Sequence, residues 1–496
     1  MKQQMPKYEQ YVTERDLELK EAHERVRLPS HRLGHALTWP LRRMKKLFVS
    51  SSNGRAKKRV LYICHNHPSV KPGGAEIYAL ELYEAVRQSD EFEPWLLARG
   101  GSPDSIQMPP GTCLRMIADD PNQYLFFTDL SGFDFFYGTS SEQSIYTKCL
   151  REFLSACQPD IVHIQHTHLI GYNVLRHIKD LLPTTPIVYT LHEYLPICLH
   201  CGQMTRTTLG NENCLEASPR RCNECFPQIP PQQFVLRKQS TQAHFSLVDL
   251  FLAPSQFLLE RYVDWGIPRE KIRFEDYGRR LSPGRARTAR ENGRQRNRIG
   301  YFGQVTPFKG VDVLLKAMKI LGEEGCDVHL WLHGANLEFQ EQEFQNELRE
   351  LLAATKQNVT MVGAYVNSNL PKLMEEIDWV VVPSIWWENS PLVIQEAFHN
   401  GRPVICSNIG AMAEKVRDGI DGLHFGVRDP LSLAQVIRCA SESPKLWQTL
   451  RRGISDVYRI KDHVTTLTDI YRTLIAKKLS DALILEKTSV DLGQAG

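Results

Sequence analysis

The sequence predicts an α/β protein with two doubly wound domains that face each other across a cleft, preceded by a helical and basic extension. At 496 residues the chain is too long for a single core. Short apolar runs alternate with amphipathic helical patterns, which is typical of a parallel sheet covered by helices on both faces. This alternation stops at a basic stretch, residues 279–298, and then starts again. Two tandem domains follow from these observations.

The composition is that of an ordinary globular protein. Apolar residues make up 42% and charged residues 24% of the chain, both close to average values. No run of about 18 apolar residues occurs, so no membrane-spanning helix is expected. The first ten residues, MKQQMPKYEQ, lack the apolar core of a signal peptide. We therefore expect a cytoplasmic protein.

Basic charge gathers near the N-terminus. The net charge is only +3, yet residues 30–59 hold nine Lys or Arg and no Asp or Glu. With Trp39 and Phe48 among them, these cations can lie on an anionic membrane surface, which would make the protein peripheral on the inner face of the cell membrane. A basic linker, or a segment packed on the first domain, is the alternative. Charge confined to short segments does not indicate nucleic-acid binding.

The patterns divide the chain into five parts. These are a helical and basic extension (1–58), a first α/β domain (59–278), a linker (279–298), a second α/β domain (299–455) and a C-terminal segment (456–496). The extension contains a charged, helix-compatible stretch at residues 8–28. The C-terminal segment contains another helical stretch, HVTTLTDIYRTLIAKKL.

The first domain begins with a strand, a Gly-rich loop and a helix. The run RVLYIC predicts the strand, and IYALELYEAVRQ predicts the helix. Further strands of this domain are predicted at residues 161–164, 187–191 and 247–254. Strands of the second domain are predicted at residues 298–303, 328–334, 359–363, 379–384 and 403–407. Because ligands of such sheets bind beyond the carboxyl ends of the strands, the active site is expected between the domains.

The segment after the strand at 379–384 is the most specific. Ser390-Pro391 predicts a helix start with Ser390 as the cap and Pro391 as the first helical residue. Glu388 then lies in the loop and Glu396 on the helix. The free N–H groups at this helix start favour phosphates, while the two carboxylates can bind hydroxyl groups. On spacing alone, two surface acids around an ordinary helix start are the alternative.

The eight-residue spacing of Glu388 and Glu396 resembles the E-x(7)-E signature of retaining glycosyltransferases of family 4, whose fold is GT-B with two Rossmann-like domains. The resemblance spans roughly residues 59–450 and is dense over 298–430. It implies that Glu388 contacts the donor sugar and takes part in catalysis, and that Glu396 contacts the ribose. It further implies a crossover helix in the C-terminal segment. The remaining donor-binding residues that it implies are Gly303, Gln304, Lys309, Gly334, Tyr365, Val366, Asn389, Ser390, Pro391 and Leu392.

The loop that opens the second domain suits a diphosphate. Gly303 and Gln304 end a predicted strand, and Lys309-Gly310 precede a helix. The resemblance assigns the phosphate-binding lysine, with a catalytic role, to Lys309. Family members usually have Arg where Gln304 stands, and Gln brings no charge. Arg279 or Arg280 could compensate.

The first domain contributes glycines and histidines. Gly73 and Gly74 form a turn before the first helix, and the resemblance places them near the donor phosphates. His166 and His168 follow the strand at 161–164. The resemblance implies that a histidine here lies near the donor sugar and the acceptor, with His166 as the catalytic choice, His168 second and His192 also on the acceptor side. Packing or structural hydrogen bonding is the alternative for each histidine.

Five of the twelve cysteines lie within one insert, residues 198–225. Two C-x2-C pairs, Cys198 with Cys201 and Cys222 with Cys225, have a spacing typical of structural zinc sites. Cys214 is an alternative ligand. A reduced loop without metal is the other interpretation. No cofactor is expected for catalysis itself, because the GT-B resemblance implies metal-independent chemistry.

We therefore predict a retaining, metal-independent hexosyltransferase. Its donor would be a UDP-, GDP- or dTDP-sugar, since these residues do not distinguish the bases. Its acceptor would be a glycan or a lipid-linked glycan, as in bacterial surface polysaccharide or lipopolysaccharide assembly. The alternative is a non-catalytic binding or scaffold protein on the same fold at the membrane face, which the uncharged Gln304 favours.

Overall fold

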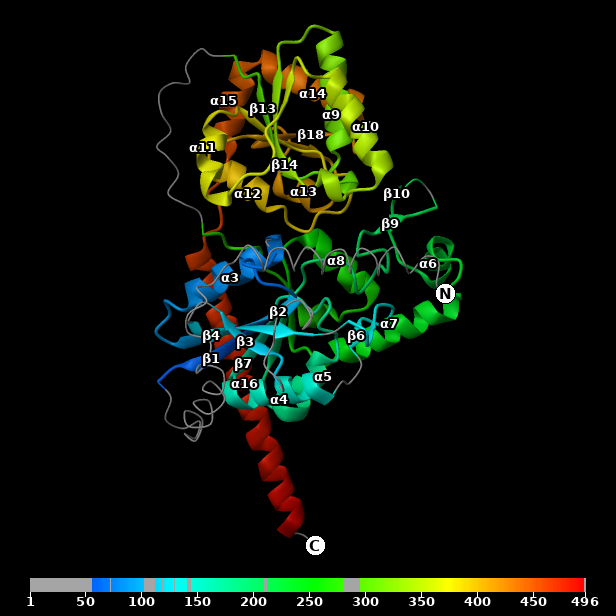
Figure 1. Cartoon of the computed structure of the whole chain (residues 1–496). Coiled ribbons are helices and arrows are strands. Elements are labelled where there is room, and N and C mark those ends of the chain that lie inside the picture. Colours follow the sequence, from blue (N-terminus) through cyan, green and yellow to red (C-terminus); the bar gives the residue numbers. More distant parts are fainter. Residues whose placement is uncertain are drawn as a thin grey trace, which may run out of the picture.

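Two α/β domains, one above the other in Figure 1, form the body of the protein, and each is built on one large sheet of mainly parallel strands. The computed structural model describes residues 56–71, 73–101, 112–117, 120–128, 130–140, 144–208, 210, 212–280 and 295–494, with the backbone alone for 144–145 and 482–494. The predicted helix at residues 8–28 and nearly all of the basic segment lie outside these residues. Among the described helices, none is long and apolar enough to cross a membrane.

The first sheet has eight strands, of which only β3 runs antiparallel to its neighbour. Across the sheet, the strands are β12 (Ile272–Phe274), β11 (Leu250–Ala253), β8 (Ile187–Thr190), β7 (Ile161–Ile164), β1 (Lys58–Cys64), β2 (Phe92–Gly101), β4 (Asp120–Phe127) and β3 (Leu114–Ile117). The helices of this domain are α3 (Gly74–Val86), α4 (Ser144–Cys157), α5 (Val174–Leu181), α6 (Pro219–Cys225), α7 (Pro231–Phe245) and α8 (Gln256–Trp265). Two short hairpins, β5 (Phe133–Asp134) with β6 (Thr139–Ser140) and β9 (Thr205–Arg206) with β10 (Glu212–Asn213), lie outside the sheet.

The second sheet has six strands, all parallel. Their order is β15 (Val359–Met361), β14 (His329–Ala335), β13 (Arg298–Gln304), β16 (Trp379–Val382), β17 (Val404–Ser407) and β18 (Gly422–Phe425). The helices of this domain are α9 (Val311–Glu323), α10 (Gln342–Ala354), α11 (Leu370–Glu375), α12 (Leu392–His399), α13 (Gly410–Lys415), α14 (Pro430–Glu442) and α15 (Pro444–Gly453).

Side chains of one strand alternate between two cores, as the pleat requires. Val60 and Tyr62 of β1 pack with α3, whereas Leu61 and Ile63 belong to the core on the opposite face. The strands predicted from sequence are present with ends shifted by up to three residues. β2 was not predicted, because Pro94 and the Gly100-Gly101 pair interrupt its apolar pattern.

The long helix α16 (Ile460–Gln494) returns from the second domain to the first, as the family resemblance implied. Leu467, Tyr471 and Ile475 are part of the core that α3 and β1 form. The Tyr471 hydroxyl lies 2.6 Å from His163 Nδ1 and 3.3 Å from the Tyr62 hydroxyl. The other ring nitrogen of His163, Nε2, lies 2.7 Å from Thr190 Oγ1. Burial lowers the pKa of His163 well below its ordinary value, so this histidine is neutral and its two ring nitrogens are hydrogen-bonded to Tyr471 and Thr190. The helix therefore completes the first domain (Figure 1).

Replacing Tyr471 with Phe should destabilise the first domain. The change removes a hydroxyl and leaves His163 Nδ1 buried without a partner, which costs about 1–3 kcal/mol. Urea unfolding should show this decrease in the free energy of unfolding. Lys477→Ala, an exposed change on the same helix, should stay within about 0.5 kcal/mol of the wild type. Equal stability of all three proteins would contradict a structural role for this hydroxyl.

Candidate active site

Each sheet reverses its strand order at one point, and the predicted site residues follow the strands at these points. In the first sheet the reversal lies between β1 and β7, and in the second between β13 and β16. His166 follows β7, Lys309 follows β13 and Glu388 follows β16. Ligands of doubly wound sheets bind at such reversal points, beyond the carboxyl ends of the strands.

Lys309 and Glu388 form an ion pair at the reversal point of the second sheet. Lys309 Nζ lies 2.6 Å from Glu388 Oε1. The same oxygen accepts hydrogen bonds from Ser384 Oγ (2.7 Å) and Trp386 Nε1 (3.0 Å). The Glu388 side chain is 8% exposed and that of Lys309 is 29% exposed. A buried carboxylate held by three donors has a fixed position, while the lysine still reaches solvent.

A glycine turn brings Lys309 to this place. Gly310 has a φ of +66°, and a Cβ atom there would collide with the Pro383 carbonyl oxygen. Only glycine allows the loop after β13 to pack so closely on the loop after β16. Gly303 and Gly334 are also packed together, since a Cβ on Gly334 would lie 2.6 Å from the Gly303 carbonyl oxygen. Gln304 is exposed.

The first residues of two helices from different domains are in contact. α3 begins at Gly74 and α12 at Leu392, and a Cβ on Gly74 would lie 3.6 Å from Leu392 Cδ1. Gly73 precedes α3 as its cap residue. The starts of the two helices are therefore close, and helix N-termini favour an anion, but at α3 the Glu76 carboxylate already lies over the helix start, since a Cβ on Gly73 would be 2.4 Å from Glu76 Oε2.

The predicted capping role of Ser390 was wrong. α12 starts at Leu392, one residue later than predicted, and Pro391 occupies the cap position with extended backbone. The Ser390 hydroxyl instead donates to Asp276 Oδ1 of the first domain at 3.1 Å. Asp276 also accepts from Gln395 and Lys415. This carboxylate ties the start of α12 to the first domain and so takes the hydroxyl away from the helix.

Glu396 is buried in an ion pair that the sequence did not reveal. Arg279 Nη2 lies 3.1 Å from Glu396 Oε1, and Arg279 Nε lies 3.2 Å from Glu81 of α3. The Arg279 side chain is 1% exposed. Burial raises the pKa of Glu396, and Arg279 opposes that rise. Arg280 pairs with Glu84. Both arginines thus bind carboxylates of α3, so neither replaces the charge that Gln304 lacks.

The predicted base-side residues differ in exposure. Tyr365 packs edge-on against His333, with ring centroids 6.3 Å apart, and against Phe302 at 5.7 Å. Val366 is 65% exposed. Asn389 donates from Nδ2 to the carbonyl oxygen of His192 in the first domain. The loop before α12 therefore contacts both domains.

Both ring nitrogens of His192 form hydrogen bonds within the protein. Its Nε2 lies 3.0 Å from Gln165 Oε1, which can only accept, so Nε2 carries the proton. Its Nδ1 then accepts from the Tyr277 hydroxyl at 2.6 Å. Burial lowers the pKa of His192 to about 3. His192, one of the predicted acceptor-side histidines, is therefore neutral and holds the side chains of Gln165 and Tyr277 in place.

His166 and His168 lie in a cluster with a third histidine that the sequence analysis missed, His65 after β1. The rings of His65 and His166 are 4.0 Å apart, and those of His166 and His168 are 5.9 Å apart. His65 Nε2 lies 2.9 Å from Glu76 Oε1 in the first turn of α3. Burial alone would raise the pKa of Glu76, but His65 brings it below its ordinary value.

Glu193, also missed, faces His166. Its Oε1 lies 3.8 Å from His166 Nε2, and its Oε2 accepts from the Leu195 backbone N–H. Burial raises the pKa of Glu193 to about 8. Burial lowers the pKa of His166 well below its ordinary value. The signal that could have found Glu193 is its place after β8, the strand next to β7 in the sheet.

The cysteine-rich insert contacts the second domain. His200 lies with its ring 6.4 Å from that of Phe308, beside Lys309, and Trp387 Nε1 donates to the Cys214 carbonyl oxygen at 3.3 Å. The insert thus adjoins Glu388 and its ion pair. None of the twelve cysteines forms a disulfide.

Four of the five cysteines of the insert are neighbours of one another. Burial, together with the nearby Cys198, Cys214 and Cys225, raises the pKa of Cys222 to about 12. Cys201 is exposed, whereas Cys198, Cys214, Cys222 and Cys225 are partly buried. Among the described residues, no three His, Cys, Asp or Glu side chains are arranged to hold a metal ion. The zinc site stays a prediction.

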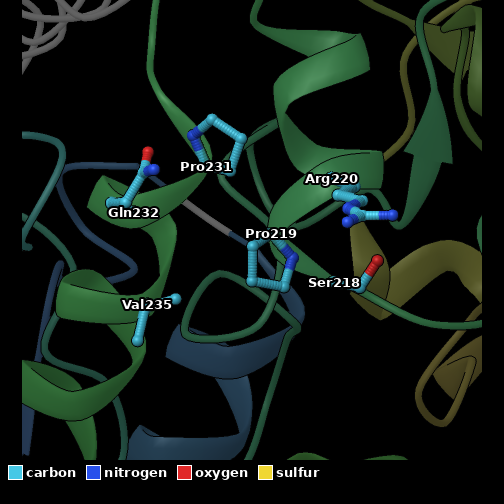
Figure 2. Close-up of a pocket in the computed structure, with 6 residues that line it drawn as sticks. All are labelled: Ser218, Pro219, Arg220, Pro231, Gln232 and Val235. Atoms are coloured by element: carbon cyan, nitrogen blue, oxygen red, sulfur yellow. The ribbon is translucent and has the colours of Figure 1, made fainter.

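A shallow pocket of about 380 Å³ lies on the outer part of the insert, between the starts of α6 and α7. Figure 2 shows Pro219, Pro231 and Val235 around this hollow, with Arg220 and Ser218 on one side. None of the predicted site residues lines it. This pocket is therefore separate from the predicted site.

Two family models match the two halves of the chain. The family described as Glycosyltransferase Family 4 matches residues 72–274, and that described as Glycosyl transferases group 1 matches residues 296–443. The chain belongs to these glycosyltransferases. The two matches contain both sheets apart from β1, together with the loops that carry Lys309, Glu388 and Glu396.

Curated relatives of this glycosyltransferase match it to different extents. A D-inositol 3-phosphate glycosyltransferase of Jonesia denitrificans is 24% identical over 408 residues, which are 80% of this chain and 90% of the relative. An uncharacterized 41.2 kDa protein in the cps region of Klebsiella pneumoniae is 26% identical over 45% of this chain and 62% of its own length. A lipopolysaccharide 1,2-N-acetylglucosaminetransferase of Salmonella typhimurium is 29% identical over 28% of this chain and 36% of its own.

Solved structures confirm the fold of the glycosyltransferase. Alr3699/HepE of Anabaena, in complex with UDP, matches with a TM-score of 0.57 and 16% identity, covering 84% of this chain and 100% of HepE. Other structures of HepE contain UDP and glucose, or UDP-glucose. At this identity the likeness establishes the fold, which is GT-B, as the resemblance implied.

Glu193→Gln should change how stability depends on pH. The raised pKa means that the folded protein keeps a proton on Glu193 between its ordinary value of 4.5 and about 8, whereas the unfolded chain releases it. The stabilising contribution is therefore complete below pH 4.5 and is lost as the pH rises through 8. Glutamine does not titrate. Relative to the wild type, the variant should gain up to about 1.4 kcal/mol per pH unit in this window.

Urea unfolding at pH 5.5, 6.5 and 7.5 measures this difference. Glu216→Gln, an exposed change in the insert, should show a constant difference from the wild type. A constant difference for Glu193→Gln as well would contradict the raised pKa.

The zinc prediction can be tested on the purified protein. If thiolates of the insert hold zinc, elemental analysis should find about one zinc ion per chain, and Cys222→Ser should reduce it strongly. Cys439→Ser, at an exposed cysteine of the second domain, should leave the metal content unchanged. Absence of zinc from protein purified without chelators would show that the insert is held by packing alone.

Proposed function

We propose that this glycosyltransferase moves a hexose from a nucleoside diphosphate sugar to an acceptor hydroxyl, with retention of the anomeric configuration and without a catalytic metal ion. The observation that carries the proposal is the Lys309–Glu388 ion pair in the loops before α9 and α12, together with the contact between the starts of α3 and α12. Two helix ends and a lysine provide for a diphosphate. A fixed carboxylate provides for sugar hydroxyls.

The ion pair suggests how the donor enters. A diphosphate would compete with Glu388 for Lys309, and the carboxylate would then be available to the sugar. As the bond to the sugar breaks, negative charge grows on the leaving phosphate, and Lys309 with the helix N–H groups would stabilise it. The helix N-termini would supply the attraction for phosphate that, in other members of the family, comes from an arginine at the position of Gln304.

The nucleoside would lie on the second domain. Glu396 would accept hydrogen bonds from the ribose hydroxyls, and Tyr365 would lie beside the base. UDP-, GDP- and dTDP-sugars remain open as donors. The presence of UDP and UDP-glucose in structures of HepE supports a uridine nucleotide as the first to test.

The acceptor would be a glycan or lipid-linked glycan of a bacterial surface polysaccharide. The lipopolysaccharide N-acetylglucosaminetransferase among the relatives supports this class. The basic residues 30–59 would hold the enzyme at an anionic membrane, at the inner face where such acceptors are built.

Saturation-transfer NMR with UDP-, GDP- and dTDP-sugars should reveal one selected donor. Lys309→Ala should weaken its binding by about 10-fold to 100-fold, because hydrogen bonds between charged groups contribute about 1.5–3 kcal/mol. Glu396→Ala should abolish the selection for the ribonucleotide. Glu350→Ala, an exposed change on α10, should bind like the wild type.

The product of the first turnovers should carry the same anomeric configuration as the donor, which proton NMR can read directly. An inverted product would refute retention. Failure of the folded protein to bind any donor would refute the transferase site and favour the scaffold alternative.

A further inference from the structure

A buried arginine from outside the second domain contacts the carboxylate assigned to the ribose. Arg279 lies between β12, the last strand of the first sheet in the sequence, and β13, whereas Glu396 belongs to α12. Arg279 Nη2 is 3.1 Å from Glu396 Oε1, and the two side chains are 1% and 9% exposed. The proposed nucleoside site therefore includes a cation that the second domain does not itself supply.

The planar guanidinium of Arg279 uses two of its edges. Nε lies 3.2 Å from Glu81 Oε2 and Nη2 lies 3.5 Å from Glu81 Oε1, so one edge faces α3. The other hydrogen of Nη2 lies on the edge shared with Nη1, because the N–H groups form a rigid fork. Glu396 accepts at this second edge. Nη1 is buried and has no hydrogen-bond partner among the described residues, so one donor beside Glu396 is unused.

The charge state of Glu396 depends on this arginine. Burial raises the pKa of the carboxyl group, and the charge of Glu81 adds to the rise. Arg279 opposes the rise most strongly, followed by a hydrogen bond from the Asn367 side chain. Burial, with the charge of Glu396, also raises the pKa of Tyr365, so the ring assigned to the base is close to this carboxylate. Without Arg279, Glu396 would bind a proton more readily.

Protonation would change what Glu396 can bind. An ionised carboxylate only accepts hydrogen bonds, so both of its oxygens can receive hydroxyl groups of a pentose. A carboxylic acid uses one oxygen as a donor and offers fewer acceptor positions. Hydrogen bonds to an ionised group are also stronger than those between neutral groups. Recognition of a nucleotide's hydroxyl groups at Glu396 therefore requires the charge to be kept.

We propose that Arg279 determines how strongly the nucleoside site selects the hydroxyl groups of the pentose. It holds Glu396 ionised, so that the carboxylate accepts from one pentose hydroxyl, and its Nη1 donates to the oxygen of that same hydroxyl. Because Arg279 also binds Glu81 of α3, this selection by the second domain depends on a contact with the first. The role of Arg279 rests on the proposed function.

Calorimetric titration with matched deoxynucleotides tests this role. The probes are UDP and GDP, each with its 2′-deoxy and 3′-deoxy forms, and dTDP with its 3′-deoxy form. For the wild type at pH 7.5, we expect one deoxy form to bind about 10-fold to 100-fold more weakly than its parent, because a hydrogen bond to a charged group is lost. Phosphate ionisation affects parent and deoxy form alike, so it cancels in the ratio of the two affinities.

Arg279→Gln removes the charge and keeps a polar side chain. At pH 6 the carboxyl group of Glu396 should be protonated in this variant, so the ratio should fall to about 2-fold or less. The ratio should return as the pH rises and Glu396 ionises. Arg279→Lys keeps the charge and should retain most of the ratio. Arg280→Gln is the matched control, because this neighbouring arginine is half-exposed and pairs with Glu84; it should behave like the wild type.

Glu81→Gln separates the charge of Arg279 from its packing. Glutamine still accepts a hydrogen bond from Arg279, but the negative charge that raises the pKa of Glu396 is gone. The ratio should therefore persist to a lower pH than in the wild type. If Arg279→Gln does not fold, this shift decides between the two roles, since a packing role predicts none.

The outcomes also separate Arg279 from the proposed function. Failure of the wild type to bind any nucleoside diphosphate would refute the proposed function itself. A wild type that binds parent and deoxy forms equally, or an Arg279→Gln ratio equal to that of the wild type at every pH, would overturn the role of Arg279 alone. A ratio lost at every pH in both Arg279→Gln and Arg279→Lys would show a packing role and overturn it too.

Discussion

The relation of the two domains depends on Arg279, a buried cation at the place where the chain passes between them. Its backbone N–H donates to the Tyr458 carbonyl, and its carbonyl accepts from Ile460, so the departing and returning segments are joined. Its side chain binds Glu81 of α3 and Glu396 of α12. Losing one partner of a buried ion pair leaves a charge uncompensated. The buried side chain of Arg279 therefore fixes the distance between α3 and α12.

Much of the active-site geometry follows from topology. Lys309 and Glu388 are far apart in sequence, yet each follows a strand at the same reversal point of the second sheet. The equivalent point of the first sheet carries His65 and His166. Contacts between the domains then bring these two edges together, through Asn389 on His192 and Ser390 on Asp276. The fold places the groups, and short local contacts orient them.

The sequence predicted what depends on local pattern. Apolar runs located most strands, and the E-x(7)-E spacing with its strand and helix located Glu388 and Glu396. The sequence did not predict hydrogen-bond and ion-pair partners that belong to another domain. The hydroxyl of Ser390 looked like a helix cap, but Asp276 binds it across the domain boundary. Arg279 was assigned to a linker because nothing local shows that it becomes buried between two carboxylates. Glu193 was missed for a different reason, because only the pairing of β8 with β7 in the sheet brings it next to His166.

The return of α16 has a consequence for recombining such enzymes. Residues 467–475 of this helix lie in the core of the first domain, although the chain reaches them only after the second. The parts that share a core are thus not contiguous in sequence. A chimera that exchanges the nucleotide-binding half between relatives must keep α16 with the parent that supplies β1, β7 and α3. A single junction cannot do this, and two junctions, one on each side of the second sheet, are required.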